Sequence, residues 1–334
     1  MSSFPMPCTL PSSSEEEAES TAYKVMRTVW VPWQRERRLM REQERMLATR
    51  RSAWLGAGYR HAVVLRCDGG VACWGSNDVL GQAPPDGVDG DFVATTAGAF
   101  HSMALRRNGS VVCWGWNSNG QAPPDGVEGD FVAIAAGGRH SLALRRNGNV
   151  ACWGMNNYGQ APPNGVNGVE GDFVAIAAGG RHSLALRRNG NVVCWGLNDH
   201  GQAPPDGVEG DFVAIAAGVV HSLALRRDGS VACRGLNDHG QAPPDGVPGV
   251  FIAVAAGGAH SLALRRDGSI ACWGRNQFDQ APPGGMDGDF VAIGAGEYFS
   301  MALRHDGSIA CWGRNGDDQA PPDGMRGPFK TPEV

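Results

Sequence analysis

Residues 173–196 read FVAIAAGGRHSLALRRNGNVVCWG, and this stretch decides the fold. Residues 173–178 form a short apolar run, which indicates a strand packed between two layers. Residues 182–188 and 191–195 predict two further short strands. The pair Asn189-Gly190 between them is a strong signal for a two-residue hairpin turn, in which both residues have a positive φ. The stretch therefore predicts three antiparallel strands.

The same unit recurs seven times between residues 53 and 322. Its second predicted strand begins with His in six copies and with Phe in the seventh, at intervals of 39 to 42 residues: His61, His101, His140, His182, His221, His260 and Phe299. Self-similarity at this period is typical of propellers and repeat arrays. A three-stranded unit cannot bury its faces alone, so we expect the copies to stack on one another.

A closed ring is favoured over an open solenoid, because no polar capping repeat follows the last copy. We therefore predict an all-β, seven-bladed β-propeller with repeats of about 39 residues, mostly with three strands per blade. Two segments compete for the first strand of the first blade. Residues 52–58 come before the predicted second strand of that blade, and residues 328–331 restart the motif at the C-terminal end of the chain. We expect the N-terminal segment there, because it keeps the apolar pattern for longer.

The chain divides into three predicted parts. Residues 1–20 contain four Glu and predict a disordered acidic tail. Residues 21–51 hold nine Lys or Arg against three Glu and predict a basic amphipathic α-helix. We expect this helix to cap the propeller, with contact to a membrane surface or to another protein as the alternative. Residues 52–334 form the predicted propeller.

Composition excludes several classes of function. The net charge is −5, and the predicted propeller is mildly acidic, which argues against a nucleic-acid-binding surface. The N-terminus has no apolar core of a signal peptide, and no apolar run is long enough to span a membrane. The sequence therefore predicts a cytoplasmic or nuclear protein that is not secreted.

The repeated unit G-x-x-H-S-L-A-L-R-R-D-G-S-V-A-C-W-G resembles the repeats of the regulator of chromosome condensation (RCC1) family. The short unit and its G-Q-A-P-P linker are most similar to the compact three-stranded version in propellers of the β-lactamase-inhibitor protein II type. The resemblance implies the propeller fold. Members of this family include an exchange factor for a small GTPase, parts of ubiquitin ligases, a plant photoreceptor and an enzyme inhibitor, so the resemblance leaves the function open.

The recurring side chains are interpreted as scaffold. Each copy has Cys in the C-W-G slot, and six copies have Trp beside it, with Arg234 in the fifth. Cys packs as a small apolar residue, and Trp is expected to pack between blades. Arg234 then indicates a weakened interface or a local salt bridge. Each His is expected to bond a loop backbone or the recurring Asn of its unit, such as Asn198.

No spacing of these residues fits catalysis, a cofactor or a metal ion, so we predict a protein that is not an enzyme and has none of these sites. Arg pairs such as Arg187-Arg188 follow the second strands, and acids such as Glu170 and Asp172 lie in the linkers. The chain path places both at one end of the blade, where we expect them to neutralise each other.

The copies differ mainly in two short loops, one before the His slot and one after C-W-G. Strand direction places both loops at the same end of the blade. Our hypothesis is that this face binds a protein partner, because aromatic residues and Arg anchor protein interfaces. A regulator of a small GTPase and a proteinaceous enzyme inhibitor are the alternatives. The predicted binding residues are Tyr59, Arg60, Phe100, Trp116, Arg139, Tyr158, Arg181, His200, Val220, His239, Arg275, Phe278, Tyr298 and Arg314.

Overall fold

The computed structural model describes residues 54–77, 80–163, 171–327 and 329–331. The chain divides into two compact units, residues 1–46 and 47–334, and the described residues all belong to the second. The predicted acidic tail (1–20) and basic helix (21–51) lie outside the described residues. Within the described part, no helix is long and apolar enough to cross a membrane.

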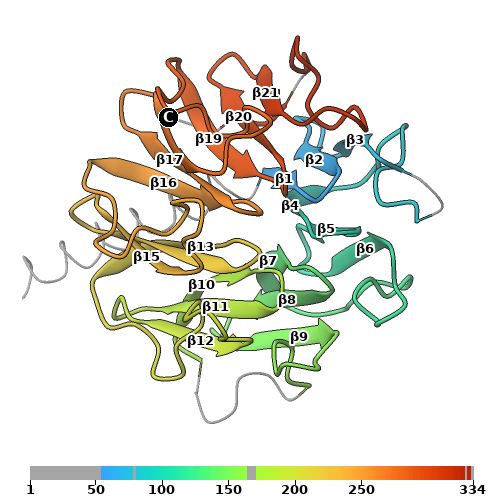
Figure 1. Ribbon diagram of the computed structural model, residues 1–334. Helices are drawn as coiled ribbons and strands as arrows, with labels where there is room; N and C mark the ends of the chain where they lie inside the picture. The colour runs from blue at the N-terminus through green and yellow to red at the C-terminus, as the bar shows by residue number, and fades with distance from the viewer. Residues whose placement is uncertain (1–53, 78–79, 164–170, 328, 332–334) are drawn as a thin grey trace, which may run out of the picture. The chain divides into compact units, whose positions relative to one another are not determined.

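The described residues contain seven three-stranded antiparallel sheets, one per repeat, arranged as the blades of a propeller (Figure 1). The first strands line the centre: β1 (Leu55–Ala57), β4 (Phe92–Ala97), β7 (Phe131–Ala136), β10 (Phe173–Ala178), β13 (Phe212–Ala217), β16 (Phe251–Ala256) and β19 (Phe290–Ala295). The middle strands are β2 (His61–Leu65), β5 (His101–Arg106), β8 (His140–Arg145), β11 (His182–Arg187), β14 (His221–Arg226), β17 (His260–Arg265) and β20 (Phe299–Arg304). The third strands are β3 (Val71–Gly75), β6 (Val111–Gly115), β9 (Val150–Gly154), β12 (Val192–Gly196), β15 (Val231–Gly235), β18 (Ile270–Gly274) and β21 (Ile309–Gly313). The predicted seven-bladed propeller is confirmed.

The hairpin between the second and third strands differs from the predicted turn. In the fourth blade the amide of Arg187 donates to the Asn191 carbonyl (2.8 Å), and the amide of Gly190 donates to the Arg187 carbonyl (3.0 Å). Gly190 has a φ of 98°, whereas Asn189 does not have a positive φ. The turn is therefore a three-residue loop that ends in a glycine bulge. The prediction of a two-residue turn was wrong, because Asn-Gly fits both turns and here Asn189 Oδ1 instead accepts the Asn191 amide (2.9 Å).

The linker after each third strand folds back onto that strand. Its Pro-Pro pair lies in a turn, which in the fourth blade the Gly207 amide closes by donating to the Pro204 carbonyl (2.9 Å). Val208 then forms a single bridge with Val192, through two hydrogen bonds of 2.8 and 2.9 Å. Equivalent bridges occur in the described linkers of every blade except the third, whose linker includes residues 164–170 outside the described part.

Adjacent blades are joined by a buried polar network, which we call the junction network. Between the third and fourth blades, Ser183 Oγ and Trp195 Nε1 both donate to the Gln160 carbonyl, each at 2.9 Å. His140 Nε2 lies 2.9 Å from Ser183 Oγ. Since the only hydroxyl proton of Ser183 goes to the carbonyl, the imidazole must donate from Nε2. The predicted interblade role of Trp is confirmed.

The partner predicted for the histidines was wrong. The pairs are His61–Ser102, His101–Ser141, His140–Ser183, His182–Ser222, His221–Ser261 and His260–Ser300, at 2.8 or 2.9 Å. Each imidazole thus reaches across to the next blade. The recurring Asn is occupied within its own loop, where Asn198 Oδ1 accepts the amide of Ala203 (2.8 Å). Sequence proximity favoured Asn198, but stacking of the blades brings the serine closer.

Two of the seven junctions in the described part have a different set of side chains. Between the seventh and first blades, Phe299 and Ala62 replace His and Ser, and both are fully buried in one apolar cluster. Trp74 Nε1 still donates to the Gln319 carbonyl (3.1 Å). Between the fourth and fifth blades Arg234 replaces Trp. It is exposed, and within the described residues it forms no salt bridge.

The first blade combines both ends of the described chain. Leu55 to Ala57 pair with β2, and the Leu65 amide donates to the Trp54 carbonyl (3.0 Å). Phe329 forms a bridge with Arg66 on the same edge of β2. The predicted use of the N-terminal segment is confirmed, and the C-terminal segment adds a phenylalanine at the start of this strand.

The change from one chain end to the other falls at a β-bulge. In the complete strand β10, Phe173 pairs with Arg187, and the register shifts before Ala175 pairs with Leu186. By position, Phe329 corresponds to Phe173 and Trp54 to Ala175. An extra residue already interrupts the ladder at a bulge. In each of the other six blades the ladder is interrupted at this same point. The two chain ends therefore meet at a position where continuous hydrogen bonding is not required.

Apolar cores fill the space between neighbouring blades. One cluster joins Leu142 and Leu144 of β8 with Phe173 and Ala185 of the fourth blade. The recurring cysteines belong to these clusters, and burial raises the pKa of the Cys194 thiol to about 12. Their thiols therefore stay protonated at neutral pH, as expected of packing residues rather than nucleophiles. Burial of each large apolar side chain stabilises the fold by about 1.5–3 kcal/mol.

At the end of the propeller that carries the hairpins, arginines recur from blade to blade, and several of them are paired with aspartates. In the fourth blade Arg187 Nη1 lies 3.1 Å from Asp172 Oδ1, and its Cζ lies 5.3 Å from the centre of the Phe173 ring. Equivalent pairs join Arg145 to Asp130 and Arg304 to Asp289, and related pairs join Arg66 to Asp89, Arg107 to Asp91 and Arg227 to Asp211. The predicted neutralisation of arginines by linker acids is confirmed at these positions.

The junction network predicts a non-additive response to mutation. Ser183→Ala leaves the buried Nε2–H of His140 without an acceptor, which we expect to lower the free energy of unfolding by about 1–3 kcal/mol. His140→Phe combined with Ser183→Ala reproduces the pair found between the seventh and first blades and should recover most of this loss. Urea unfolding of both single variants, His140→Phe and Ser183→Ala, and of the double variant measures the coupling. A double variant as unstable as the sum of both single variants would contradict the prediction.

The six buried histidines predict a loss of stability in acid. Burial lowers the pKa of His140 and His221 to about 3 and that of His61 to about 4, against about 6.5 in the unfolded chain. Below pH 6.5 the unfolded state therefore binds more protons than the folded state. Stability is complete above about pH 6.5 and falls toward pH 4, by up to about 1.4 kcal/mol per pH unit for each histidine.

Thermal melting between about pH 7 and about pH 5 measures this linkage. The variant His140→Phe with Ser183→Ala should take up one proton fewer on unfolding, so its stability should depend less steeply on pH. An unchanged pH dependence in this variant would show that the junction histidines are not the responsible groups.

Candidate interaction face

The loops in which the repeats differ meet at one end of each blade. In the second blade the Trp116 amide donates to the Phe100 carbonyl (2.8 Å), and in the fourth the Leu197 amide donates to the Arg181 carbonyl (2.9 Å). These bonds join the loop before the middle strand to the loop after the third strand. We call the surface formed by these loops the variable face. It lies at the opposite end of the blades from the paired arginines.

Aromatic rings connect the first three blades across the variable face. The ring of Phe100 packs edge-on against Tyr59, with centroids 5.4 Å apart, and against Trp116, at 5.8 Å. Arg139 of the third blade lies over the Trp116 ring, with its Cζ 4.8 Å from the centroid. Such edge-to-face and cation–π contacts each contribute about 0.5–1.5 kcal/mol. Four predicted residues from three blades therefore form one cluster.

The next contact again places an Arg of one blade over an aromatic ring of the preceding blade. Arg181 of the fourth blade lies over the ring of Tyr158 from the third, with Cζ 5.2 Å from its centre. Its Nη1 also donates to the Tyr158 hydroxyl at 3.3 Å. The loop after the third strand of one blade thus contacts the loop before the middle strand of the next. This contact depends on blade stacking, so it does not follow from the sequence of either repeat alone.

A second cluster joins the sixth and seventh blades. Phe278 packs edge-on against Tyr298, with centroids 5.7 Å apart. The guanidinium groups of Arg275 and Arg314 lie 5.8 and 5.9 Å from the centre of the same Tyr298 ring. Four further predicted residues are therefore brought together here.

Two acidic residues of the variable face were missed by the selection of aromatic residues and Arg. Glu297 is half-buried beside Tyr298. Burial raises the pKa of Glu297, and the nearby arginines oppose this effect. Burial and the charge of Glu297 also raise the pKa of Tyr59 to about 12. Asp317 lies 3.9 Å from Arg60. Both acids occupy variable slots, so the difference between repeats was a signal that could have identified them.

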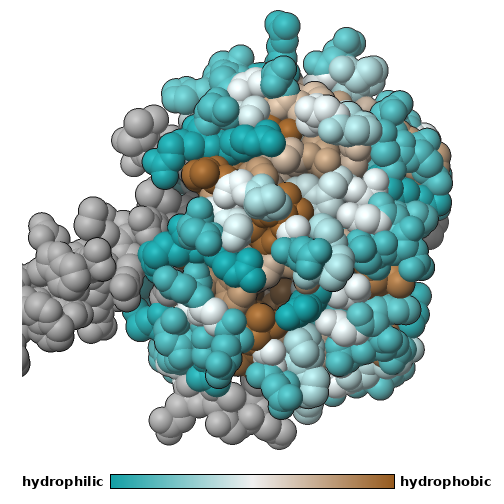
Figure 2. All heavy atoms as spheres, turned by 60° about the vertical axis from the view of Figure 1, so that its left-hand side comes forward, coloured by the Kyte–Doolittle hydropathy of each residue, from teal (hydrophilic) through white to brown (hydrophobic). Residues whose placement is uncertain are grey.

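The remaining predicted residues are not brought into a cluster. His200 and His239 are exposed, and within the described residues their side chains form no hydrogen bond. Val220 is half-buried. In the sequence it falls between His200 and His239. Figure 2 shows apolar surface in small separate patches among polar residues. Tyr158 and Phe278 are among the few large apolar side chains that are exposed, at 40% and 37%.

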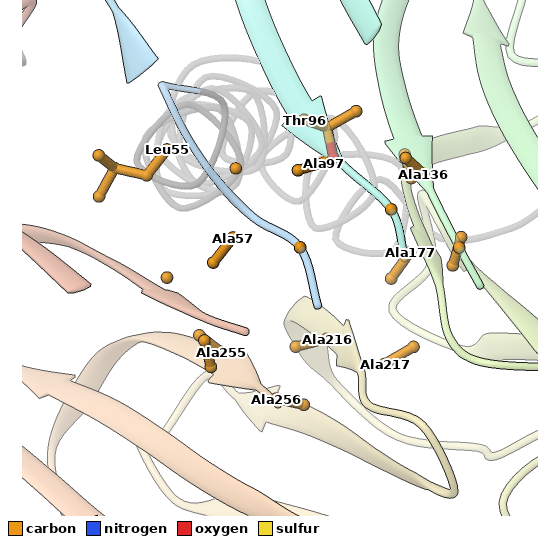
Figure 3. A pocket seen from close by; sticks show the side chains of 18 of the residues that line it. Leu55, Ala57, Thr96, Ala97, Ala136, Ala177, Ala216, Ala217, Ala255 and Ala256 are labelled. Atoms are coloured by element: carbon orange, nitrogen blue, oxygen red, sulfur yellow. The ribbon is translucent and has the colours of Figure 1, made fainter. Parts of the chain in front are cut away.

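A central cavity of about 720 Å³ lies between the first strands and is lined by all seven blades. Its wall consists mainly of alanine and glycine, and Figure 3 shows the short side chains of Ala57, Ala97, Ala177 and Ala216 around it. Tyr59 and Glu297 line it on the variable face, and Lys330 also contributes to its lining. Side chains of this size leave the cavity open, and they provide few polar groups to orient a ligand.

Burial keeps the recurring titratable side chains of the blade junctions uncharged. The junction histidines are buried and neutral, and the junction cysteines are protonated, because burial shifts both pKa values toward the uncharged form. Within the described residues, no group of three or more His, Cys, Asp or Glu side chains is placed to hold a metal ion. The variable face instead presents aromatic and Arg side chains, which are residue types enriched in protein interfaces, together with two acidic side chains.

Solved structures of proteins from several organisms are similar to this chain in fold. The ectodomain of receptor kinase CR4 from Physcomitrella patens is 27% identical, with a TM-score of 0.62, over 78% of this chain and 72% of that one. The ectodomain of receptor kinase ACR4 from Arabidopsis thaliana is 24% identical, with a TM-score of 0.63, over 81% and 97%. Prp20p from Saccharomyces cerevisiae is 22% identical, with a TM-score of 0.59, over 79% and 83%.

No curated protein matches the sequence. The family model described as the regulator of chromosome condensation (RCC1) repeat matches seven times, at residues 55–82, 92–121, 131–160, 173–202, 212–241, 251–280 and 290–319. Each match begins near the first strand of a blade and ends at the glutamine of its junction network. The seven matches together cover more than half of the chain, which therefore belongs to the RCC1 repeat family.

Proposed function

We propose that this protein is a non-catalytic interaction module that binds a protein partner through the variable face. One observation carries the proposal. The positions at which near-identical repeats differ lie in loops that contact one another from blade to blade, and they hold aromatic, Arg and acidic side chains. RCC1 repeats form propellers that act as binding or exchange factors, which agrees with this function.

The opposite end of the propeller provides the contrast. There the arginines repeat in register and are paired with linker aspartates. Apart from the sixth blade, where exposed Val250 takes the position of the linker aspartate, this surface offers similar groups from blade to blade, so it provides little to distinguish one partner from another. The variable face offers a different set of groups in each blade, and specificity requires such differences.

Substitution on the variable face should abolish partner binding without unfolding the propeller. The test variant carries Arg139→Glu, Arg181→Glu and Phe278→Ala, which change two cation–π contacts and one exposed ring. Loss of such anchors typically weakens binding by about 2 kcal/mol or more each. Affinity capture with mass spectrometry should recover a specific protein with the wild-type chain and lose it with this variant.

A matched variant on the opposite end controls for charge and stability. Arg146→Glu, Arg266→Glu and Val132→Ala make the same kinds of change at exposed positions outside the variable loops. This control should retain the partner, and both variants should melt at nearly the wild-type temperature. Equal capture by all three proteins would refute the proposed face.

Regulation of a small GTPase is a more specific form of the same function. The structure of Prp20p was described together with its binding to Gsp1p and histones, but its 22% identity supports the fold alone. If the captured partner is a GTPase, release of its labelled nucleotide in the presence of wild-type and test variant decides whether exchange occurs. If the partner is an enzyme, its residual activity decides whether the protein inhibits it.

A further inference from the structure

Six of the seven blade junctions in the described part are closed by an indole. Each Trp donates from Nε1 to the carbonyl of the preceding blade's junction glutamine, at 2.9 to 3.1 Å: Trp74, Trp114, Trp153, Trp195, Trp273 and Trp312. Between the fourth and fifth blades this position belongs to Arg234. The Gln202 carbonyl there accepts a hydrogen bond from Ser222 Oγ (2.8 Å) and none from an indole.

Replacement of the indole leaves this junction more open than the others. Ser222 is 7% exposed, whereas Ser102, Ser141, Ser183, Ser261 and Ser300 are 0% exposed. Ala224, two residues further along β14, is half-buried, whereas the equivalent Ala185 is fully buried. Arg234 pairs with Ser222 across the ladder, so the same side of the sheet carries all three residues. The guanidinium does not seal the opening as an indole does.

Arg234 itself is exposed and has no hydrogen bond or ion pair within the described residues. It contrasts with several arginines of the hairpin end, which are paired with aspartates. An exposed guanidinium favours a carboxylate, with which it forms a two-pronged hydrogen bond. The junction therefore combines a partly exposed apolar wall, a carbonyl with spare acceptor capacity and an unpaired cation.

We propose that the junction between the fourth and fifth blades binds a tryptophan side chain of a partner protein that has an acidic residue next to it. The other six junctions show which group fits: a flat apolar ring with one N–H donor directed at the glutamine carbonyl. The carboxylate beside it pairs with Arg234. This site lies at a blade junction and not in the loops that form the variable face. It does not depend on the proposed function of that face.

The probe is an acetylated, amidated Glu-Trp-Glu tripeptide that contains fluorotryptophan, and fluorine NMR follows its binding to the full chain. Wild-type protein should bind one equivalent, and the same peptide with Leu in place of Trp should not bind. Arg234→Trp fills the position with the chain's own indole. It should raise the melting temperature and weaken peptide binding by at least about tenfold, a loss of about 1.4 kcal/mol.

The reciprocal variant is Trp195→Arg, which opens the junction between the third and fourth blades in the same way. The natural chain already tolerates Arg at the equivalent position, and this variant should bind a second equivalent of peptide. Binding of the peptide to Arg234→Trp as tightly as to the wild-type chain would overturn the proposal, as would absence of binding to the wild-type chain. The variant with the three substitutions on the variable face should bind the peptide normally, which separates this site from the proposed function.

Discussion

The backbone carbonyl of the junction glutamine is the acceptor on which the structure depends. It receives a serine hydroxyl and an indole N–H from the next blade, and the serine in turn receives a histidine N–H. Backbone hydrogen bonds such as that from the Gly180 amide to the Gly218 carbonyl (3.1 Å) also join neighbouring blades, but this network lies between their apolar faces, where apolar packing alone does not fix how one sheet stacks on another. A buried network has few alternative arrangements, so it sets the position of each blade relative to the last.

The exceptions are consistent with this role. Where the chain ends meet, His and Ser are replaced together by Phe299 and Ala62, so no buried donor is left without an acceptor. A single replacement would leave such a group, and that costs more than exchanging both for apolar side chains. At the fifth blade only the indole is replaced, and there the junction opens toward solvent. The ring thus tolerates the loss of one indole donor at the surface. The buried His and Ser, in contrast, are replaced together.

The two ends of the blades have different roles because the chain reverses between them. At the hairpin end, tight turns recur in every copy, and linker aspartates neutralise arginines in several of the blades. At the variable face, short loops without a required conformation accept substitution. Blade stacking then brings these loops together, so that Trp116 meets Arg139 and Phe278 meets Tyr298. A scaffold with little variation can therefore present a surface that is unique around the ring.

The sequence by itself determined the number of blades, the strand order and the loops that vary, because these are local and repeat at a fixed period. It also placed the N-terminal segment in the first blade. Only the tertiary structure decided that His140 bonds Ser183 rather than an asparagine of its own repeat, that Phe329 completes the first strand, and that Glu297 belongs with the aromatic residues. Each of these contacts joins different blades, and local periodicity contains no information about how two blades stack. For the same reason Arg234 was only an irregularity in the pattern until the neighbouring junctions showed which group it replaces.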